Sequence, residues 1–275
     1  MYFWGVTVNS KIHEHTLRLF VFFICISIVS NAYGGKWRWD KWLVPGNPVK
    51  DFIDLHKKLF TSWSTYKTAV AFFPPFIFAR MFDKDLQNVF YCRKHHKNKN
   101  QLPKWCHDIC HWGVSLPMAI LASTAFLAKD WELRTTGWVF LLGMPFVILG
   151  KDIFKSMEVD CNLRPWNQRF CRKKRALGGF PSGHMAELTY MAVLYGKRYG
   201  MIAVAPLAGF ATFLGLSFVN CNRHYISQII GGAALGTAYA LAADKLISSK
   251  LSCDITAGFT LDNRGTPAFK ISYNF

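Results

Sequence analysis

Long apolar stretches, separated by short polar or basic segments, run through most of this chain. The stretch 201–219 contains no charged residue and is nearly long enough to span a bilayer. Residues 229–243 are rich in Gly and Ala, which favours close packing of helices in a membrane. The pattern predicts a mainly α-helical, multi-helix membrane bundle, and a soluble bundle of fully buried helices is the alternative. The apolar stretches cover roughly residues 19–29, 68–79, 112–128, 137–150, 185–196, 201–219 and 229–243.

The C-terminal segment has a different period. Apolar residues alternate from Ile255 to Leu261 and again from Phe269 to Phe275, and Asp262-Asn263-Arg264-Gly265 supplies turn residues between them. Alternation on both sides of a turn predicts a short β-hairpin.

The N-terminus resembles an export signal. Lys11 and Arg18 precede the apolar run 19–29, and small residues follow at 30–32. This layout is typical of a signal peptide, or of a first membrane helix that is retained. We therefore expect four segments: a leader over 1–32, an exported basic segment over 33–105, a helical core over 106–250 and a hairpin tail over 251–275.

The order of the apolar stretches places two loops on one face of the membrane. Suppose that the first apolar run, 19–29, crosses outward. If the stretch 68–79, which is broken by Pro74-Pro75, does not span, the loops 151–183 and 220–228 share the outer face. If it does span, the same two loops share the cytoplasmic face. We expect the outer face, which is the periplasmic face of a bacterial inner membrane.

Composition and charge narrow the function classes. The chain has 275 residues, of which 51% are apolar, and its 33 basic and 16 acidic side chains give a net charge of +17. This much apolar surface excludes a disordered chain, and eight cysteines are too few for a small disulfide scaffold. Nucleic acid, an anionic membrane surface or a phosphate-bearing substrate would each match the charge. Zinc-finger spacing, a basic zipper and an RNP pattern are all missing from the sequence, so we expect no nucleic-acid partner.

The sequence gives no strong metal or cofactor signal. Residues 106–111 read CHDICH, but on a helix the two cysteines and the two histidines form separate pairs that point in different directions. We therefore expect neither a metal ion nor a cofactor.

An anion site is predicted where residues 180–184 lead into an apolar helix. Pro181 ends the preceding loop, Ser182 is a favourable N-cap residue, and Gly183 leaves its backbone N–H open to a ligand. Free N–H groups and the helix dipole favour an anion at such a position. His184 lies in the first turn and is placed to donate a proton. The alternative is a capped helix in which the histidine has no catalytic role, and the same residues would fit it.

His224 follows 40 residues later and is predicted to lie on the same face. Two histidines beside an anion site can act as nucleophile and general acid. Lys155 and Arg164 can neutralise phosphate oxygens without a metal. Eight basic residues against three acidic ones in 151–175 give this rim a local excess of positive charge.

Together these pieces resemble the type 2 phosphatidic acid phosphatase (PAP2) superfamily. Its pattern is a Lys, six residues and Arg-Pro, then Pro-Ser-Gly-His, then Ser-Arg, five residues, His, three residues and Asp. Arg164-Pro165, Pro181–His184 and His224 match, while Lys155 lies two residues too far upstream. The resemblance implies that His224 attacks phosphorus, that His184 protonates the leaving group, and that four groups hold the phosphate: Lys155, Arg164, Ser182 and the Gly183 amide.

The third motif departs from the family pattern. The second Arg of the pattern falls on Phe218, and its Asp, which orients the nucleophilic histidine, falls on Gln228. Gln228 can accept a hydrogen bond from the imidazole but cannot stabilise imidazolium charge. Arg223 is the candidate replacement for the missing Arg, and Lys151 is an alternative to Lys155.

We therefore predict a metal-independent PAP2-type membrane phosphatase that hydrolyses a lipid-linked phosphate monoester or diphosphate. One alternative is a soluble periplasmic acid phosphatase of the same superfamily, acting on a small phosphate ester. The other is a catalytically weakened or inactive member that binds phosphorylated lipid.

Overall fold

The structure is a computed structural model of the chain. It describes residues 48–92, 97–98, 109, 113–156, 164–165, 178–251, 254–261 and 267–274. The predicted leader, nearly all of the CHDICH segment and most of the basic loop between Lys155 and Gly178 lie outside the described residues.

The described part of the chain is mainly α-helical, as the apolar pattern predicts. It contains α2 (Pro48–Thr61), α3 (Trp63–Phe90), α5 (Ser115–Leu127), α6 (Trp131–Ser156), α8 (Gly183–Tyr199), α9 (Met201–Asn220) and α10 (Ile226–Leu251). Within these residues, three helices are long and apolar enough to cross a membrane, judged by length and composition: Trp131–Lys155, Met201–Asn220 and Ile226–Leu251.

Two short antiparallel sheets complete the described elements. β1 (Tyr91–Cys92) pairs with β2 (Lys97–Asn98) directly after α3. β3 (Asp254–Leu261) pairs with β4 (Pro267–Asn274) in a register that sets Ile255 opposite Tyr273 and Phe259 opposite Phe269. The two strands coincide with the two C-terminal segments in which apolar and other residues alternate.

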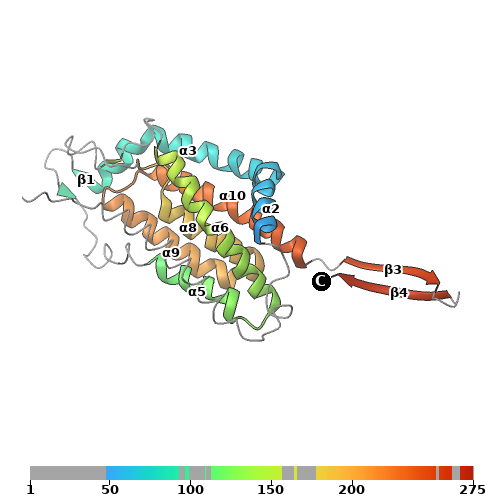
Figure 1. Cartoon of the computed structure of the whole chain (residues 1–275). Coiled ribbons are helices and arrows are strands. Elements are labelled where there is room, and N and C mark those ends of the chain that lie inside the picture. Colours follow the sequence, from blue (N-terminus) through green and yellow to red (C-terminus); the bar gives the residue numbers. More distant parts are fainter. Residues whose placement is uncertain are drawn as a thin grey trace, which may run out of the picture. The chain divides into compact units, whose positions relative to one another are not determined.

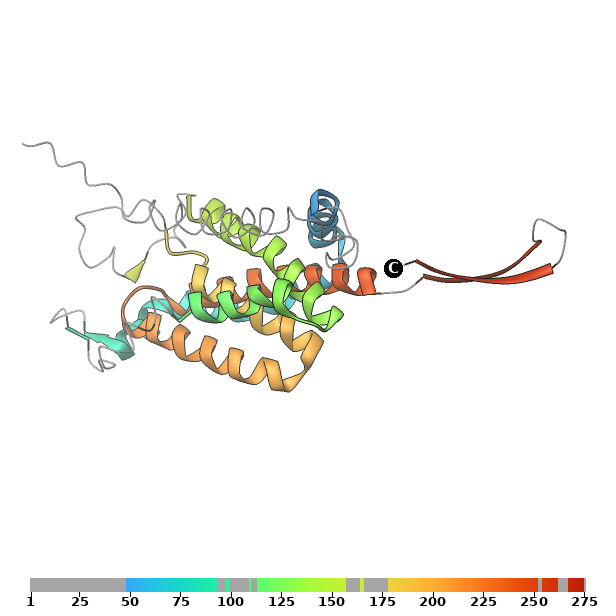
Figure 2. The same cartoon turned by 60° about the horizontal axis from the view of Figure 1, so that its bottom comes forward.

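α10 is the central helix of the bundle, since it packs against α8, α3, α6 and α2 (Figure 1). α8 lies between α10 and α9, and α5 packs on α6 (Figure 2). The Gly-rich start of α10 permits its close approach to α8. A Cβ on Gly232 would lie 2.4 Å from the carbonyl oxygen of Ser182, and one on Gly236 would lie 2.2 Å from that of Ala186. Only glycine fits at these two contacts, which bring the start of α10 onto the start of α8.

α3 is one continuous helix that contains both Pro74 and Pro75. Pro74 and Pro75 therefore do not break the helix within the segment 68–79. Proline removes one backbone donor and bends a helix, but long apolar helices in membranes tolerate it. The side chains of α3 are also arranged in an unusual way for a soluble protein. Asp83 and Gln87 are buried, while large apolar side chains are exposed, among them Val70, Phe73, Phe78 and Met81.

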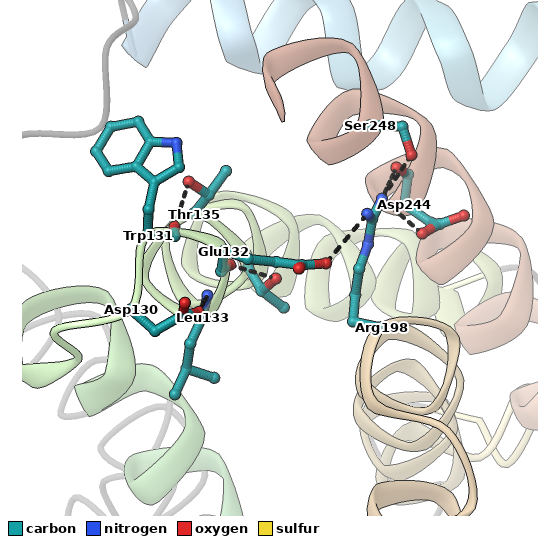
Figure 3. A network of polar contacts seen from close by, with 9 residues as sticks. Asp130, Trp131, Glu132, Leu133, Thr135, Arg198, Asp244 and Ser248 are labelled. Carbon is teal, nitrogen blue, oxygen red and sulfur yellow. Dashed lines mark hydrogen bonds and ion pairs between the residues drawn. The ribbon is translucent and has the colours of Figure 1, made fainter. Parts of the chain in front are cut away.

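The end of the bundle near the α8–α9 turn is closed by a polar network around Arg198 of α8 (Figure 3). Arg198 pairs with Asp244 of α10 at 2.7 Å and with Glu132 of α6 at 3.6 Å, and it donates to Ser248 at 2.7 Å. These contacts join α6, α8 and α10 at the end from which α9 begins.

Candidate active site

Ser182 directly precedes α8 and occupies the predicted N-cap position, because its carbonyl accepts the first helical bond, from the Ala186 N–H at 3.0 Å. Its hydroxyl makes no capping bond. The Oγ atom is buried and has no hydrogen-bond partner in the described part of the chain. A buried hydroxyl without a partner is costly unless a ligand or water completes it. The oxygen is thus available to a bound anion.

Gly183 makes room for a lysine of α6. A Cβ at this position would lie 2.7 Å from Cδ and 2.9 Å from Nζ of Lys151. The same ammonium group lies 2.7 Å from the carboxylate of Glu187, one turn further along α8, and both side chains are buried. Lys151 therefore lies beside the start of α8, but its charge is already paired.

Arg164 joins two loops of the site through its guanidinium group. Nη2 donates to the carbonyl of Gly178 at 2.9 Å, and Nη1 donates to the carbonyl of Arg223 at 3.3 Å. The side chain is buried, with 6% of its surface exposed. The Gly178 N–H in turn donates to the carbonyl of Lys155 at 3.0 Å, which fixes the end of α6 to the same loop.

His224 and Gln228 form the core of the site. Nδ1 of His224 lies 3.2 Å from Oε1 of Gln228, and the same oxygen accepts the Tyr225 N–H at 3.3 Å. Because that atom accepts a backbone N–H, it is the amide oxygen, so Nδ1 of the imidazole carries the proton and Nε2 carries the lone pair. The predicted orientation of the histidine by Gln228 is consistent with this geometry.

The surroundings of His224 favour its neutral form. Burial lowers the pKa of His224 well below its usual value, and the nearby positive charges of Arg164 and Lys155 lower it further. His184 adds a smaller contribution of the same sign. The structure thus brings Lys155, Arg164 and His184 into the neighbourhood of His224.

Phe218 lies against both histidines. Its ring centroid is 5.0 Å from that of His184 and 5.8 Å from that of His224. Its backbone carbonyl accepts N–H bonds from Arg223 and His224 at 2.9 and 3.3 Å. An apolar ring therefore occupies the position at which the family pattern has an arginine. Arg223 is half-buried, and its backbone carbonyl is the group that binds Arg164.

Two polar residues of α3 reach the loop that carries His224, and the sequence analysis did not identify them. Asp83 accepts the N–H of Ser227 at 3.1 Å and the hydroxyl of the same residue. Gln87 donates to the carbonyl of Val219 at 2.9 Å and to the side chain of Asn222. The only signal in the sequence was their spacing of four residues, in the polar last part of a helix whose middle is apolar.

The comparisons with known proteins identify the family of this core. Residues 133–250 match the family model of the PAP2 superfamily. No curated protein matches the chain. Among solved structures, the chain is similar to a transmembrane PAP2-type phosphatidylglycerolphosphate phosphatase from Bacillus subtilis, with 20% identity and a TM-score of 0.49 over 67% of this chain and 98% of that one. The segment 133–250, which holds every predicted site residue, belongs to the PAP2 superfamily.

Proposed function

We propose that this protein is a membrane phosphatase that hydrolyses a lipid-linked phosphate monoester or diphosphate through a phosphohistidine on His224. One observation carries the proposal. A neutral, oriented imidazole lies at the start of α10, which packs directly on the start of α8, where Ser182 has a buried hydroxyl without a partner in the described part of the chain. Nucleophile and anion site therefore adjoin.

The residues divide the chemistry as follows. Nε2 of His224 attacks phosphorus while Gln228 holds the Nδ1 proton. His184 gives its proton to the leaving oxygen as the phosphorus–oxygen bond breaks. Water then attacks the phosphohistidine, His184 takes the proton of that water, and phosphate leaves as the phosphorus–nitrogen bond breaks. His224 is thereby restored.

In this proposal four groups hold the phosphate oxygens. The Ser182 hydroxyl and the Gly183 N–H offer donors at the start of α8, where the helix dipole favours an anion. Lys155 and Arg164 supply positive charge. The side chains of this set need no metal ion for the reaction described.

The apolar helices support a substrate that stays in the membrane. α6, α9 and α10 contain the three candidate spans, and the site lies where α6 and α9 end and where α10 begins. A lipid whose phosphate reaches the membrane surface would meet these ends directly, which favours lipid-linked phosphates over small soluble esters.

The position of α3 bears on which face of the membrane carries the site. Ser62, just before α3, accepts a hydrogen bond from Lys245 near the end of α10. Gln87, near the end of α3, donates to Asn222 just before α10. The two helices therefore run antiparallel side by side. α3 is not among the three helices that length and composition mark as candidate spans. We propose that its antiparallel packing on α10 carries it across a bacterial inner membrane together with α10. The site then faces the periplasm, and α3 starts on the cytoplasmic side.

This orientation has a consequence for the N-terminus. A cleaved signal peptide over residues 1–32 would place the start of α3 in the periplasm and the site in the cytoplasm. Our proposal therefore requires residues 33–62 to remain in the cytoplasm, and in this it departs from the expectation of an exported segment over 33–105. A reporter enzyme that is active only outside the cytoplasm, fused just ahead of α3, should be inactive. An active reporter would overturn the periplasmic orientation.

A phosphate-release assay tests the activity. It uses the purified full chain in detergent, short-chain lipid phosphates as substrates and a chelator to remove metal ions. We expect release by the wild type and by Gly209→Ala, since a Cβ at Gly209 has open space around it. We expect none from His224→Ala. Equal rates in His224→Ala and wild type would refute the enzyme. An inactive wild type that still binds vesicles of phosphorylated lipid would instead support the binding member that Phe218 and Gln228 suggest.

A high-salt and carbonate wash of cell membranes distinguishes the proposed membrane phosphatase from a soluble periplasmic acid phosphatase. The protein should stay in the membrane fraction. Its release into the soluble fraction would favour the soluble periplasmic acid phosphatase and would overturn the membrane placement.

A further inference from the structure

We propose that Asp83 and Gln87 of α3 are positioning residues that fix the nucleophile loop, residues 219–227, in the geometry needed for attack by His224. The inference rests on the proposed function of His224. It assigns to α3, which lies outside the matched segment 133–250, a direct part in building the site.

The two residues hold opposite ends of the nucleophile loop. Gln87 binds Val219 and Asn222, where the loop leaves α9, while Asp83 binds Ser227, where the loop enters α10. They are four residues apart and so lie on one face of α3. His224 lies between the two anchored ends, and its own N–H is held by the carbonyl of Phe218.

Asp83 also acts as a cap supplied from another helix. Ser227 is the second residue of α10, and its N–H is one of the donors that a helix start leaves without an intrahelical partner. A carboxylate at that position satisfies the donor and is favoured by the helix dipole. Arg80, one turn earlier on α3, lies 3.3 Å from the same carboxylate and balances its charge.

Gln87 meets a part of the loop that needs support. Asn222 has φ = 55°, a left-handed conformation that residues other than glycine adopt only rarely. The side chain of Asn222 accepts from Gln87, and both side chains are buried. The sharp turn before His224 is therefore held by a contact to α3 rather than by the loop alone.

A purely structural pair would stabilise the protein without affecting turnover. The position of these contacts argues for more, because all three contacted residues, Val219, Asn222 and Ser227, lie within five residues of His224 in the sequence. Displacement of a reacting group by about 1 Å can cost about 100-fold in rate. Loss of the anchors should therefore reduce kcat more than it raises KM.

The experiment compares Asp83→Leu, Asp83→Asn and Gln87→Leu in the full chain, with Asp244→Asn as the matched control at the other end of α10. We expect kcat to fall roughly 10- to 100-fold in Asp83→Leu and Gln87→Leu, with KM changed less than about threefold. Asp83→Asn keeps an acceptor oxygen for the Ser227 N–H and should retain more activity. Asp244→Asn should lower the melting temperature and leave kcat unchanged. A kcat loss no larger than that of the control would overturn the proposal.

Hydrogen exchange of the peptide that contains residues 219–228 gives a readout that does not depend on activity. Exchange there should be faster in Asp83→Leu and in Gln87→Leu than in wild type, and unchanged in Asp244→Asn. Unchanged exchange in the first two variants would overturn the positioning role. Equal phosphate release by His224→Ala and wild type would refute the proposed function instead, so the two failures are distinct.

Discussion

Nζ of Lys151 lies 2.7 Å from Oε1 of Glu187, and this buried pair joins α6 to α8 directly beside the candidate anion site. The sequence left open whether Lys151 or Lys155 is the phosphate ligand, and this ion pair gives the two lysines different roles. Lys151 is committed to Glu187, whereas Lys155 lies one turn further along α6 and contributes positive charge near His224. The two lysines should therefore respond differently to substitution.

Lys151→Met should mainly destabilise the fold. Removal of one partner leaves the carboxylate of Glu187 buried without its cation, which costs about 3–5 kcal/mol in comparable pairs. Thermal unfolding in detergent measures the loss. The double variant Lys151→Met/Glu187→Gln should recover much of it, because no unpaired charge remains. A double variant no more stable than Lys151→Met would contradict a coupled pair.

Lys155→Ala should mainly reduce turnover. Loss of one preorganised positive charge beside the phosphate is expected to lower kcat/KM by about 100-fold while the melting temperature changes little. Steady-state kinetics on a short-chain lipid phosphate provide the measurement. If Lys151→Met loses activity and Lys155→Ala does not, the phosphate ligand is Lys151.

The activity should persist at acidic pH and fail only at low pH. His224 attacks in its neutral form, so protonation as the pH falls removes the nucleophile. Because burial lowers the pKa of His224 well below its usual value of about 6.5, the acid limb of the pH–rate profile should lie below that pH. A limb at or above pH 6.5 would contradict the buried, neutral histidine.

Gln228→Glu tests the departure in the third motif. A carboxylate of similar length would keep the bond to Nδ1 and would stabilise positive charge on the imidazole. It should raise the pKa of His224, move the acid limb to higher pH and increase the rate of phosphohistidine formation. Gln228→Leu removes the acceptor, and we expect it to lower kcat. Equal pH–rate profiles for wild type, Gln228→Glu and Gln228→Leu would show that the side chain at position 228 does not orient His224.

Gly236→Ala should loosen the packing of α8 on α10. Its methyl group would meet the carbonyl of Ala186 at 2.2 Å, and overpacking of this kind typically costs about 1–3 kcal/mol. Gly209→Ala is the matched control, since open space surrounds that position and alanine favours helix. Melting temperatures should therefore fall in Gly236→Ala and hold or rise in Gly209→Ala.

Local signals in the sequence were enough to locate most of the described helices, although not α2, and the central part of the candidate site. The apolar stretches placed α8, α9 and α10, and the Pro-Ser-Gly-His run placed Ser182 ahead of α8. The contact between His224 and Gln228 was also predictable, because both residues lie within one turn of the same helix start.

Contacts that depend on how helices rotate against each other were not predictable. Asp83 and Ser227 are 144 positions apart, and their contact exists only because α3 packs on α10 with its polar face inward. The same applies to Lys151 and Glu187. The sequence also left open whether the helix would continue through Pro74 and Pro75, because the environment that tolerates them lies on other segments of the chain.

The Arg198 network fixes one end of α8 to α6 and α10 (Figure 3). At the opposite end the buried Lys151–Glu187 pair joins α6 to α8, while the start of α8 and the start of α10 meet through glycines and loop contacts. If α8 and α10 separate to admit a lipid headgroup, the separation would be greatest between His184 and His224 and smallest at Arg198.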